Sequence, residues 1–482
     1  MKTDGTAPGF YSFFAKKVVG MKVFDLQGKG TNFIAEILAG ITTFVTMTYL
    51  LIACPAILAA GGAQPGSAYL SVCLACFLGS LLMGFIANQP FVAGPSLGMT
   101  IFFSSTLLTE LDYTYTQALL ITLLAGLVVL VFTLAGFQNA IFNAIPKSLK
   151  NGISAGLGIY MALVGLKNAG FLSTDSGGQW SLLNFSERGR SLWAVGLMFF
   201  GILLIGLFRK LHFGASTTLA ILASGMVYYL GTIAARTKSL SSLSFRDLIP
   251  APQLGSFNSE AYSLWGQKVL FKNLSEGFAS LFFSDTTTWK TVLSVLVTIM
   301  ICSLFNSVES NGVIYVTARG QLDENGHFGS LKKTMLASSI SSSVSSCMGS
   351  PLLSVAPESS AGMAADGKTG LTAVTAALLF LLASMFPSVT TLIPPVITSC
   401  VMVLIGVNML GAVKDIDFGN IAEGVPAIIS MILIPFTSSV IDGIAVGLIV
   451  HMALNLLTFQ FKSVKIIEIA VAAVFVFSYF MI

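Results

Sequence analysis

The stretch of sequence that decides the fold reads GSPLLSVAPESSAG, at residues 349–362, within a long apolar part of the chain. A comparable stretch, PFVAGPSLGMT, occupies residues 90–100. Proline removes a backbone N–H donor and disfavours helix at the residue before it, so both stretches interrupt a helix. Each interruption predicts a short non-helical segment followed by a half-helix. A plain kinked helix is the alternative interpretation.

The composition around these stretches indicates a membrane protein. Hydrophobic residues make up 55% of the 482 residues and charged residues only 10%, whereas soluble chains carry about 25% charged residues. Several apolar runs reach the roughly 20 residues that a helix needs to cross a bilayer. Non-helical backbone cannot face lipid, because its polar groups would remain unpaired. The two interruptions are therefore expected inside the protein, lining a wet cavity.

The apolar runs predict about fourteen membrane spans. The first seven are placed at residues 33–58, 68–88, 91–108, 116–136, 148–171, 191–208 and 213–235. The second seven are placed at 290–318, 333–348, 350–364, 369–387, 391–412, 422–437 and 439–459. A last apolar stretch, 466–482, is short for a crossing, and the sequence leaves open whether it spans the membrane or lies at its surface.

The two halves of the chain resemble each other. Ile145-Pro146 precedes the fifth span as Ile393-Pro394 begins the twelfth, and the interrupted span is the third in each half. Seven crossings is an odd number, so the second half must be inverted in the membrane. We therefore predict an all-α polytopic membrane protein with a 7+7 inverted repeat, in which non-helical segments and half-helices form spans 3 and 10. Many secondary transporters with this architecture bind their substrate near the midplane.

The predicted organisation has five parts along the chain. These are a cytoplasmic amphipathic N-terminus (1–30), the first repeat (31–235), an extracytoplasmic loop (236–289), the second repeat (290–460) and a C-terminal apolar helix (461–482). Most of the 25 Lys and Arg fall on the side of the N-terminus, which the positive-inside rule makes cytoplasmic. The net charge of +4 gives no indication of nucleic-acid binding.

Two carboxylates inside the spans are the main candidates for chemistry. Glu309 lies in the eighth span and Glu358 at the start of the tenth half-helix. An ionisable residue at that depth costs at least about 2.5–3.5 kcal/mol, so it normally faces a cavity or a partner. Asn306, three residues before Glu309, shares its helix face. Carboxylates and amides suit a purine edge, where N–H donors lie beside acceptors. A carboxyl shielded from water can also exchange a proton near neutral pH, so both Glu309 and Glu358 are candidates for proton coupling.

Other polar residues are weaker candidates. Ser96, Thr100 and Ser359 lie at the two interruptions and are further candidates for substrate binding. His451 lies in mid-span, where a lone histidine is more often packed and hydrogen-bonded than part of a proton relay. Glu36, at the inner end of the first span, is expected to meet the lipid headgroups.

The sequence predicts neither a metal site nor catalysis. The six cysteines all lie in apolar runs, so the pair Cys73 and Cys76 is expected to pack within a helix. No histidine cluster and no catalytic Ser/His/Asp or Cys/His arrangement is evident in the sequence. We therefore expect no cofactor, no resident metal and no enzyme activity, with a proton as the coupling ion.

Several motifs resemble those of one transporter family. They are AGITTFVTMTY at 39–49, ESSAG at 358–362, GKTGLTAV at 367–374, VKDIDF at 413–418 and EGVPA at 423–427. In these motifs, and over most of its length, the chain resembles the AzgA-like hypoxanthine/guanine/adenine permeases. These belong to the nucleobase–cation symporter group, which includes the uracil and xanthine permeases.

The resemblance implies a fold and a site. The fold is that of the uracil permease, with a core domain of spans 1–4 and 8–11 and a gate domain of spans 5–7 and 12–14. The substrate is then expected between the short strands and half-helices, held by the acidic residue of the tenth span, Glu358. The resemblance also implies a bacterial inner-membrane location and a possible homodimer.

Two departures from the family pattern affect the predicted site. AzgA-like permeases typically have Phe-Asp-Thr in the eighth span, where this chain has Phe305-Asn306-Ser307. The following VESNG, residues 308–312, resembles the glutamate-containing motif of the uracil and xanthine branch. Thr100 replaces the asparagine typical of the third span. The predicted site is thus a hybrid of the two branches.

The leading hypothesis is import of a purine nucleobase (hypoxanthine, guanine, adenine or xanthine) by proton symport with alternating access. The alternative on the same fold is an anion transporter of the sulfate/bicarbonate type. Half-helix dipoles suit an anion, but two neighbouring carboxylates would repel it. An intramembrane enzyme is the third hypothesis, and the absence of a catalytic pair in the sequence argues against it.

Overall fold

The computed structural model describes most of the predicted spans. The described residues are 24–138, 145–174, 180–182, 190–211, 216–236, 278, 289–318, 328–385, 395–437, 440–458, 468–469, 472–473 and 476. Most of the predicted N-terminal amphipathic segment, nearly all of the 236–289 loop and most of the 461–482 segment lie outside the described residues, as does the Ile393-Pro394 pair.

The first half of the chain is a series of helices interrupted by one short strand. Its elements are α2 (Phe33–Met47), α3 (Leu50–Ala60), α4 (Pro65–Leu82), the π-helix η1 (Met83–Ala87), β1 (Ala93–Pro95), α5 (Leu97–Ile101), the π-helix η2 (Phe102–Glu110), α6 (Tyr115–Leu134), α8 (Lys147–Asn168), α9 (Arg190–Lys210) and α10 (Ser216–Arg236). Between α8 and α9 in the sequence, β2 (Leu172–Thr174) pairs antiparallel with β3 (Trp180–Leu182).

The second half repeats this order of elements. It contains α14 (Trp289–Thr317), α15 (Leu331–Cys347), β4 (Leu353–Val355), α16 (Ser359–Ala364), α17 (Gly370–Met385), α19 (Pro395–Leu410), the 3-10 helix η5 (Gly411–Asp415), α20 (Ile421–Thr437) and α21 (Val440–Leu457). In each half a strand and a short helix occupy the place of the third span. The predicted fold class is confirmed: the protein is mostly helical, with short strands and half-helices at spans 3 and 10.

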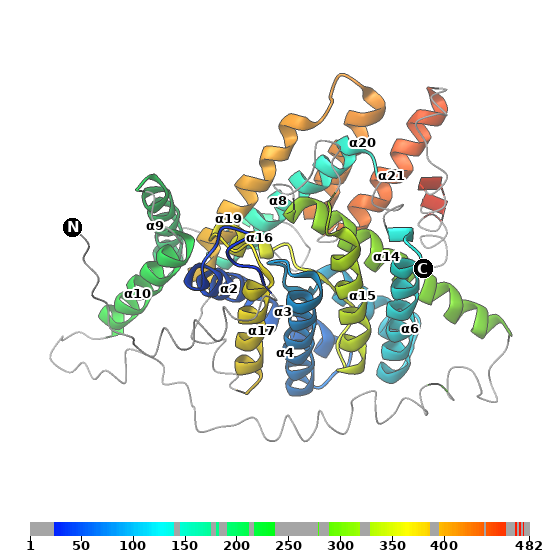
Figure 1. Ribbon diagram of the computed structural model, residues 1–482, viewed down its shortest axis with the longest axis horizontal. Coiled ribbons are helices and arrows are strands. Elements are labelled where there is room, and N and C mark those ends of the chain that lie inside the picture. The colour runs from blue at the N-terminus through cyan, green and yellow to red at the C-terminus, as the bar shows by residue number, and fades with distance from the viewer. Residues whose placement is uncertain are drawn as a thin grey trace.

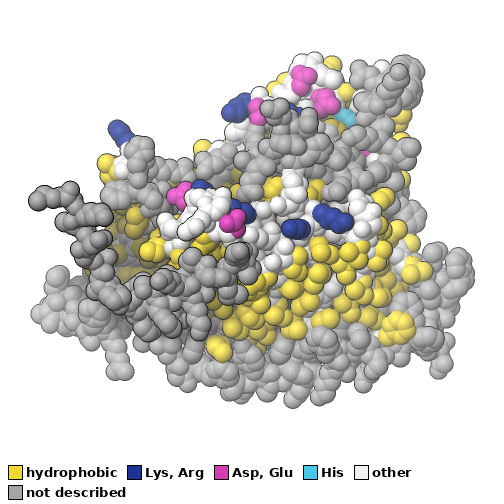
Figure 2. All heavy atoms as spheres, in the orientation of Figure 1, with side chains coloured by type: hydrophobic (Ala, Val, Ile, Leu, Met, Phe, Trp, Pro, Cys, Tyr) yellow, Lys and Arg dark blue, Asp and Glu magenta, His cyan; other side chains and the backbone are white. Residues whose placement is uncertain are grey.

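The helices have the length and composition of membrane spans. Five described helical stretches are long and apolar enough to cross a bilayer, namely Phe33–Ala59, Gly66–Ala87, Tyr115–Leu134, Lys147–Asn168 and Val295–Thr317. Shorter apolar helices accompany them, among them Trp193–Phe208, Gly370–Met385 and Ile421–Thr437. Figure 2 shows hydrophobic side chains gathered over the lower part of the visible face, with Lys, Arg, Asp and Glu above them. This separation is the pattern of a protein embedded in lipid.

The first span differs from its prediction as one continuous helix. α2 ends at Met47 and α3 begins at Leu50, with Thr48 and Tyr49 between them. The backbone amide and the hydroxyl of Thr48 both donate to the carbonyl of Val45, so hydrogen bonds here span three residues instead of four. The side chain of Tyr49 consequently lies at a break in the helix.

The two interrupted spans meet in a two-stranded antiparallel sheet. Gly94 of β1 pairs with Ser354 of β4, and the amide of Ala356 donates to the carbonyl of Val92 at 2.9 Å. Each strand thus satisfies the backbone groups of the other, which is how non-helical backbone is tolerated at membrane depth. The strands are fully enclosed by protein.

The helices pack as two sets. In the first set α8 lies against both α19 and α20, and α20 lies against α21. In the second set α15 packs on α6 and α4, α17 packs on α4 and α2, α14 packs on α6, and α16 packs on α2. Figure 1 shows α17, α4, α15 and α6 running side by side, with α8, α19, α20 and α21 gathered above them. The two sets touch where α14 packs against α8 and α21, and where α2 and α16 pack against α19.

The position of Glu36 corrects its predicted contact with lipid headgroups. Its side chain is fully buried, and its carboxylate accepts the amides of Lys368 at 3.0 Å and Thr369 at 3.2 Å. It also accepts the hydroxyl of Thr372 at 2.5 Å. The first amides of a helix have no partner within it, so Glu36 of α2 serves as the acceptor for the segment that opens α17.

Candidate substrate-binding site

Glu358 occupies the junction between β4 and α16. It is the residue before the first residue of α16, and its side chain is 2% exposed. One carboxylate oxygen, Oε1, accepts a hydrogen bond from the hydroxyl of Tyr49 at 2.6 Å. The other oxygen, Oε2, is buried without a hydrogen-bond partner. The break between α2 and α3 therefore positions a tyrosine for one half of this carboxylate and leaves the other half unpaired.

Glu309 lies on α14 and reaches the other interrupted span. Ser96, which precedes α5, accepts the amide of Met99 at 3.0 Å and lies beside Glu309 in the same pocket. Glu309 is 2% exposed, and its Oε2 is buried without a partner. The second carboxylate therefore also has an oxygen that is available to a ligand.

The two carboxylates line the same pocket. The pocket lies between the strands, α14 and α8, and its empty volume, including the part open to solvent, is about 440 Å³. The lining residues are Tyr49, Leu50, Gly94, Pro95, Ser96, Gly98, Leu157, Tyr160, Met161, Glu309, Val313, Ser354, Ala356, Pro357 and Glu358. A mostly apolar wall with a few convergent polar groups is typical of a small-molecule site.

The sequence-predicted site residues fall into two groups. Ser96, Glu309 and Glu358 line the pocket. Asn306, Thr100 and Ser359 are absent from its lining and support the surrounding backbone or helices. Thr100 donates to the carbonyl of Ser96 at 2.7 Å, and the hydroxyl of Ser359 accepts the amide of Val92 at 2.9 Å. These contacts fix the two residues beside β1, where they hold the ends of the strand in place.

Asn306 makes hydrogen bonds between helices instead of lining the pocket. Its side-chain amide donates to Ser342 of α15 at 3.1 Å, and its carbonyl oxygen is buried without a partner. On a neighbouring face of α14, Asn311 donates to Gln138 at 2.9 Å. Three residues of separation bring Asn306 near Glu309 along the helix, yet α15 takes up the face that Asn306 occupies. Asn306 thus connects α14 to α15, while Glu309 faces the cavity.

Two tyrosines of the pocket were missed by sequence reasoning. Tyr49 and Tyr160 both line the cavity, and Tyr49 bonds directly to Glu358. Tyr49 ends the first of the family motifs, so its place in that motif was the available signal. Tyr160 lies in an apolar helix with no distinguishing neighbours in sequence. Among the described residues, no group of three or more His, Cys, Asp or Glu side chains could hold a metal ion.

The fold and the pocket together define a class. Broken helices that face each other across paired strands, with buried carboxylates beside them, are the features of a membrane transporter with a central substrate site. Residues 34–446 match the model of the Permease family, Xan_ur_permease. The chain belongs to this family.

Characterised relatives align over nearly the whole chain. The adenine permease AdeQ of Escherichia coli K12 is 28% identical over 455 residues, which cover 94% of each chain. The guanine/hypoxanthine permease PbuO of Bacillus subtilis 168 is 27% identical over 466 residues, covering 95% of this chain and all of PbuO. Among solved structures, the transmembrane domain of the cyanobacterial bicarbonate transporter BicA covers 86% of this chain and 97% of its own, with 15% identity and a TM-score of 0.47. The family and the relatives AdeQ and PbuO are named as permeases, and the protein is an integral membrane permease, not an enzyme.

Proposed function

We propose that this protein is a secondary active transporter that imports purine nucleobases by proton symport with alternating access. The observation that carries this proposal is the pair of buried, unpaired carboxylate oxygens, Glu309 Oε2 and Glu358 Oε2, in one pocket. An unpaired buried acceptor costs about 1–3 kcal/mol. A ligand that brings N–H donors to both carboxylates removes that cost.

A purine matches the remaining features of the pocket. It is a flat ring whose faces can pack against apolar side chains and whose edges carry N–H donors beside acceptors. Leu157, Met161 and Val313 supply apolar surface for the ring, and the two carboxylates supply acceptors. Relatives named as adenine and guanine/hypoxanthine permeases support the same substrate class. A site built to accept N–H groups discriminates strongly against analogues that lack them, because its acceptors are then left unpaired.

The same carboxylates support the proposed proton coupling. A carboxylate only accepts hydrogen bonds, whereas a carboxylic acid also donates one. Protonation of Glu309 or Glu358 would therefore change which edge of the base the pocket can hold. Substrate and proton then bind as a pair, which is the requirement for symport.

Alternating access is supported by the position of the pocket. Tyr49, Glu309 and Glu358 come from one set of helices, and Leu157 and Tyr160 come from α8 of the other set. A substrate in the pocket therefore touches both sets, which correspond to the proposed core and gate domains. Relative movement of the two sets would open the pocket to each side in turn.

A second cavity suggests the route out of the pocket. Its empty volume is about 560 Å³, and it is lined by Ser154, Val316, Thr317, Ser360, Met363, Ile405 and Met409. Ser154 lies one turn from Leu157 on α8, and Thr317 lies one turn from Val313 on α14. On each of these two helices, the residue of the second cavity is the nearer of the two to the helix end beside the Lys-rich loops. We propose that this cavity is the cytoplasmic vestibule. The protein is then a bacterial inner-membrane protein with a cytoplasmic N-terminus. We further propose that two copies form a homodimer.

The anion-transporter alternative predicts a different pocket. A sulfate or bicarbonate ion would lie beside Glu309 and Glu358, with no basic side chain in the pocket lining to offset their charge. Like charges in a low-dielectric site repel strongly. The pocket therefore favours a neutral ligand with N–H donors over an anion.

Uptake measurements test the proposed function. Cells that lack nucleobase transporters are given the protein and labelled hypoxanthine, guanine, adenine, xanthine or uracil. We expect accumulation of at least one purine and its loss in Glu358→Gln and Glu309→Gln. The matched control is Ser430→Ala, which removes a buried hydroxyl bonded to Gly443 between α20 and α21, away from the pocket. Full uptake by Glu358→Gln, or sulfate flux without purine uptake, would contradict the proposal.

A further inference from the structure

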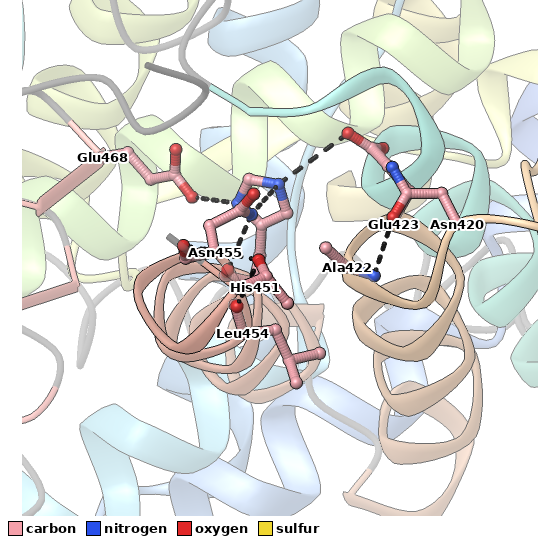
Figure 3. Close-up of polar contacts among 8 residues, drawn as sticks. Asn420, Ala422, Glu423, His451, Leu454, Asn455 and Glu468 are labelled. Atoms are coloured by element: carbon pink, nitrogen blue, oxygen red, sulfur yellow. Dashed lines mark hydrogen bonds and ion pairs between the residues drawn. The ribbon is translucent and has the colours of Figure 1, made fainter. Parts of the chain in front are cut away.

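A cluster of ionisable side chains lies outside the pocket, on α20, α21 and the end of the chain. His451 Nδ1 is 2.5 Å from Glu468 Oε1, and His451 Nε2 is 3.8 Å from Glu423 Oε1 (Figure 3). The sequence suggested a lone histidine, and the structure corrects this by placing a carboxylate near each ring nitrogen. His451 and Glu468 are 2% and 1% exposed, so the cluster is buried except at Glu423, which is 29% exposed.

The neighbours of His451 fix the position of its proton. The side-chain nitrogen of Asn455 donates to the backbone carbonyl of His451 at 2.9 Å, so this atom must be the amide nitrogen, not its oxygen. The same nitrogen lies 3.0 Å from His451 Nε2. An amide nitrogen only donates, so Nε2 accepts in this arrangement. The ring proton is then on Nδ1, which donates to Glu468.

The cluster is incomplete in this arrangement. Glu468 Oε2 is buried without a hydrogen-bond partner, and Glu423 Oε1 lies too far from Nε2 for a hydrogen bond. With a neutral ring, two carboxylates flank one imidazole and no cation offsets them within the trio. One added proton on Nε2 would create a donor between Asn455 and Glu423 and would balance one of the two charges.

The other elements around the cluster add no competing charge. Glu423 is in the first turn of α20, which Asn420 caps by accepting the amide of Ala422 at 3.0 Å. Ser148 at the start of α8 lies close to Glu423, and α8 packs against α20. Glu423 and Glu468 are the ionisable groups that act on His451 in the described part of the chain, and none comes from α14.

We propose that His451 is a proton-binding site separate from the substrate pocket, reached from solution through Glu423. A proton passes from water to the Glu423 carboxylate and then to His451 Nε2, where an N–H bond forms as the O–H bond breaks. The ring becomes an imidazolium that donates to Glu468 from Nδ1 and to Glu423 from Nε2, while Asn455 keeps its bond to the His451 carbonyl. Proton binding thereby ties α20, α21 and residue 468 into one unit within the proposed gate domain.

Proton binding can be measured without any transport. The chain has 3 histidines, so their ring carbon signals can be followed by NMR in the purified full-length protein. The signal lost in His451→Gln identifies this residue. We expect it to titrate in one step between about pH 5 and about pH 9, and Glu423→Gln to weaken the proton binding. A His451 signal that does not move over this range, or one unaffected by both Glu423→Gln and Glu468→Gln, would overturn the proposal.

The consequence for transport rests on the proposed function and is tested separately. Purine uptake into proteoliposomes is measured while the pH is varied on one side at a time. We expect His451→Gln to lose the part of the pH profile that follows the His451 titration and to retain substrate affinity. Ser430→Ala, which removes a hydrogen bond between the same two helices, should retain the whole profile. A titrating His451 without purine uptake would contradict the proposed function alone, whereas an unchanged pH profile in an active His451→Gln would show that the site has no role in transport.

Discussion

The hydroxyl of Tyr49 donates to Glu358 Oε1 across 309 positions of sequence, at a distance of 2.6 Å. The contact joins the break between α2 and α3 to the start of α16, so two irregular points of the backbone meet in one hydrogen bond. Because Oε2 of the same carboxylate is unpaired, Tyr49 decides which oxygen of Glu358 remains available to a ligand. A side chain at a helix break thus orients the principal acidic residue of the pocket.

Tyr49→Phe should weaken substrate binding while leaving the fold intact. The ring stays in place, but Glu358 loses its donor and can rotate, so the carboxylate is no longer pre-oriented. Hydrogen bonds to charged groups contribute about 1.5–3 kcal/mol, which corresponds to a loss of affinity of roughly tenfold to a hundredfold. Equilibrium binding of the labelled purine to purified protein measures this.

The matched control for this variant is Tyr69→Phe. Tyr69 donates to the carbonyl of Ala383 at 2.9 Å, outside the pocket. The Tyr69→Phe variant loses a tyrosine hydroxyl of the same kind without any change at Glu358. Its affinity for the purine should therefore equal that of the wild type. Equal affinities for Tyr49→Phe and wild type would show that Glu358 needs no orienting partner.

Glu36→Ala should lower stability more than it lowers affinity. The substitution removes the acceptor of two backbone amides and one hydroxyl at the start of α17. Each buried donor left unpaired costs about 1–3 kcal/mol. A lower temperature of half-unfolding in detergent is therefore expected, with purine affinity near that of the wild type in the folded fraction. A melting temperature equal to that of the wild type would contradict the buried position of Glu36.

Much of the fold was predictable because span boundaries depend on local chemistry. The predicted fifth span, 148–171, is α8 at Lys147–Asn168, and the predicted thirteenth, 422–437, is α20 at Ile421–Thr437. Apolar length and flanking charge set such limits without tertiary information. The proline-interrupted stretches also predicted that the helices stop where β1 and β4 lie, because proline restricts the backbone locally. That these segments are strands was implied by the family resemblance.

The candidate site was less predictable because it depends on which helix faces meet. Glu309 and Glu358 could be selected from their charge alone. Three features arise from contacts between segments that are distant in sequence. Asn306 bonds to α15, Tyr49 bonds to Glu358, and Glu36 is buried against the start of α17. His451 illustrates the same limit, since its partners Glu423 and Glu468 lie on other segments. One sequence contains no signal for these pairings beyond the residue types themselves.

Gly406→Ala should destabilise the contact between α8 and α19. A methyl group at Gly406 would lie 2.4 Å from the carbonyl oxygen of Gly158, a backbone atom that cannot move aside alone. The two helices must separate, and overpacking of this kind costs about 1–3 kcal/mol. Thermal unfolding of the purified protein, followed by size-exclusion chromatography, measures the loss. Gly206→Ala in α9 is the control, since nothing lies within 4 Å of the added methyl group. Similar melting temperatures for both variants would contradict the close approach of α8 and α19.

The proposed vestibule predicts a site where a water-soluble thiol reagent stops transport. Ser360 lines the second cavity, and Ser360→Cys changes its side chain only from oxygen to sulfur. Five of the six native cysteines are buried and the sixth, Cys347, is partly buried, so background labelling should be low. Reagent added from the side of the N-terminus should modify Ser360→Cys and block uptake. Bound purine should slow the modification, because the neighbouring pocket is then occupied.

Leu203→Cys separates exposure to water from exposure to lipid. Leu203 on α9 is 71% exposed, more than most large hydrophobic side chains of the described chain. If α9 faces the bilayer, a charged reagent cannot reach this position despite its exposure, because the reagent does not enter hydrocarbon. Ser360→Cys should therefore react in membranes while Leu203→Cys does not. Rapid modification of Leu203→Cys together with an unreactive Ser360→Cys would mean that the second cavity is closed to water and that α9 borders an aqueous space instead.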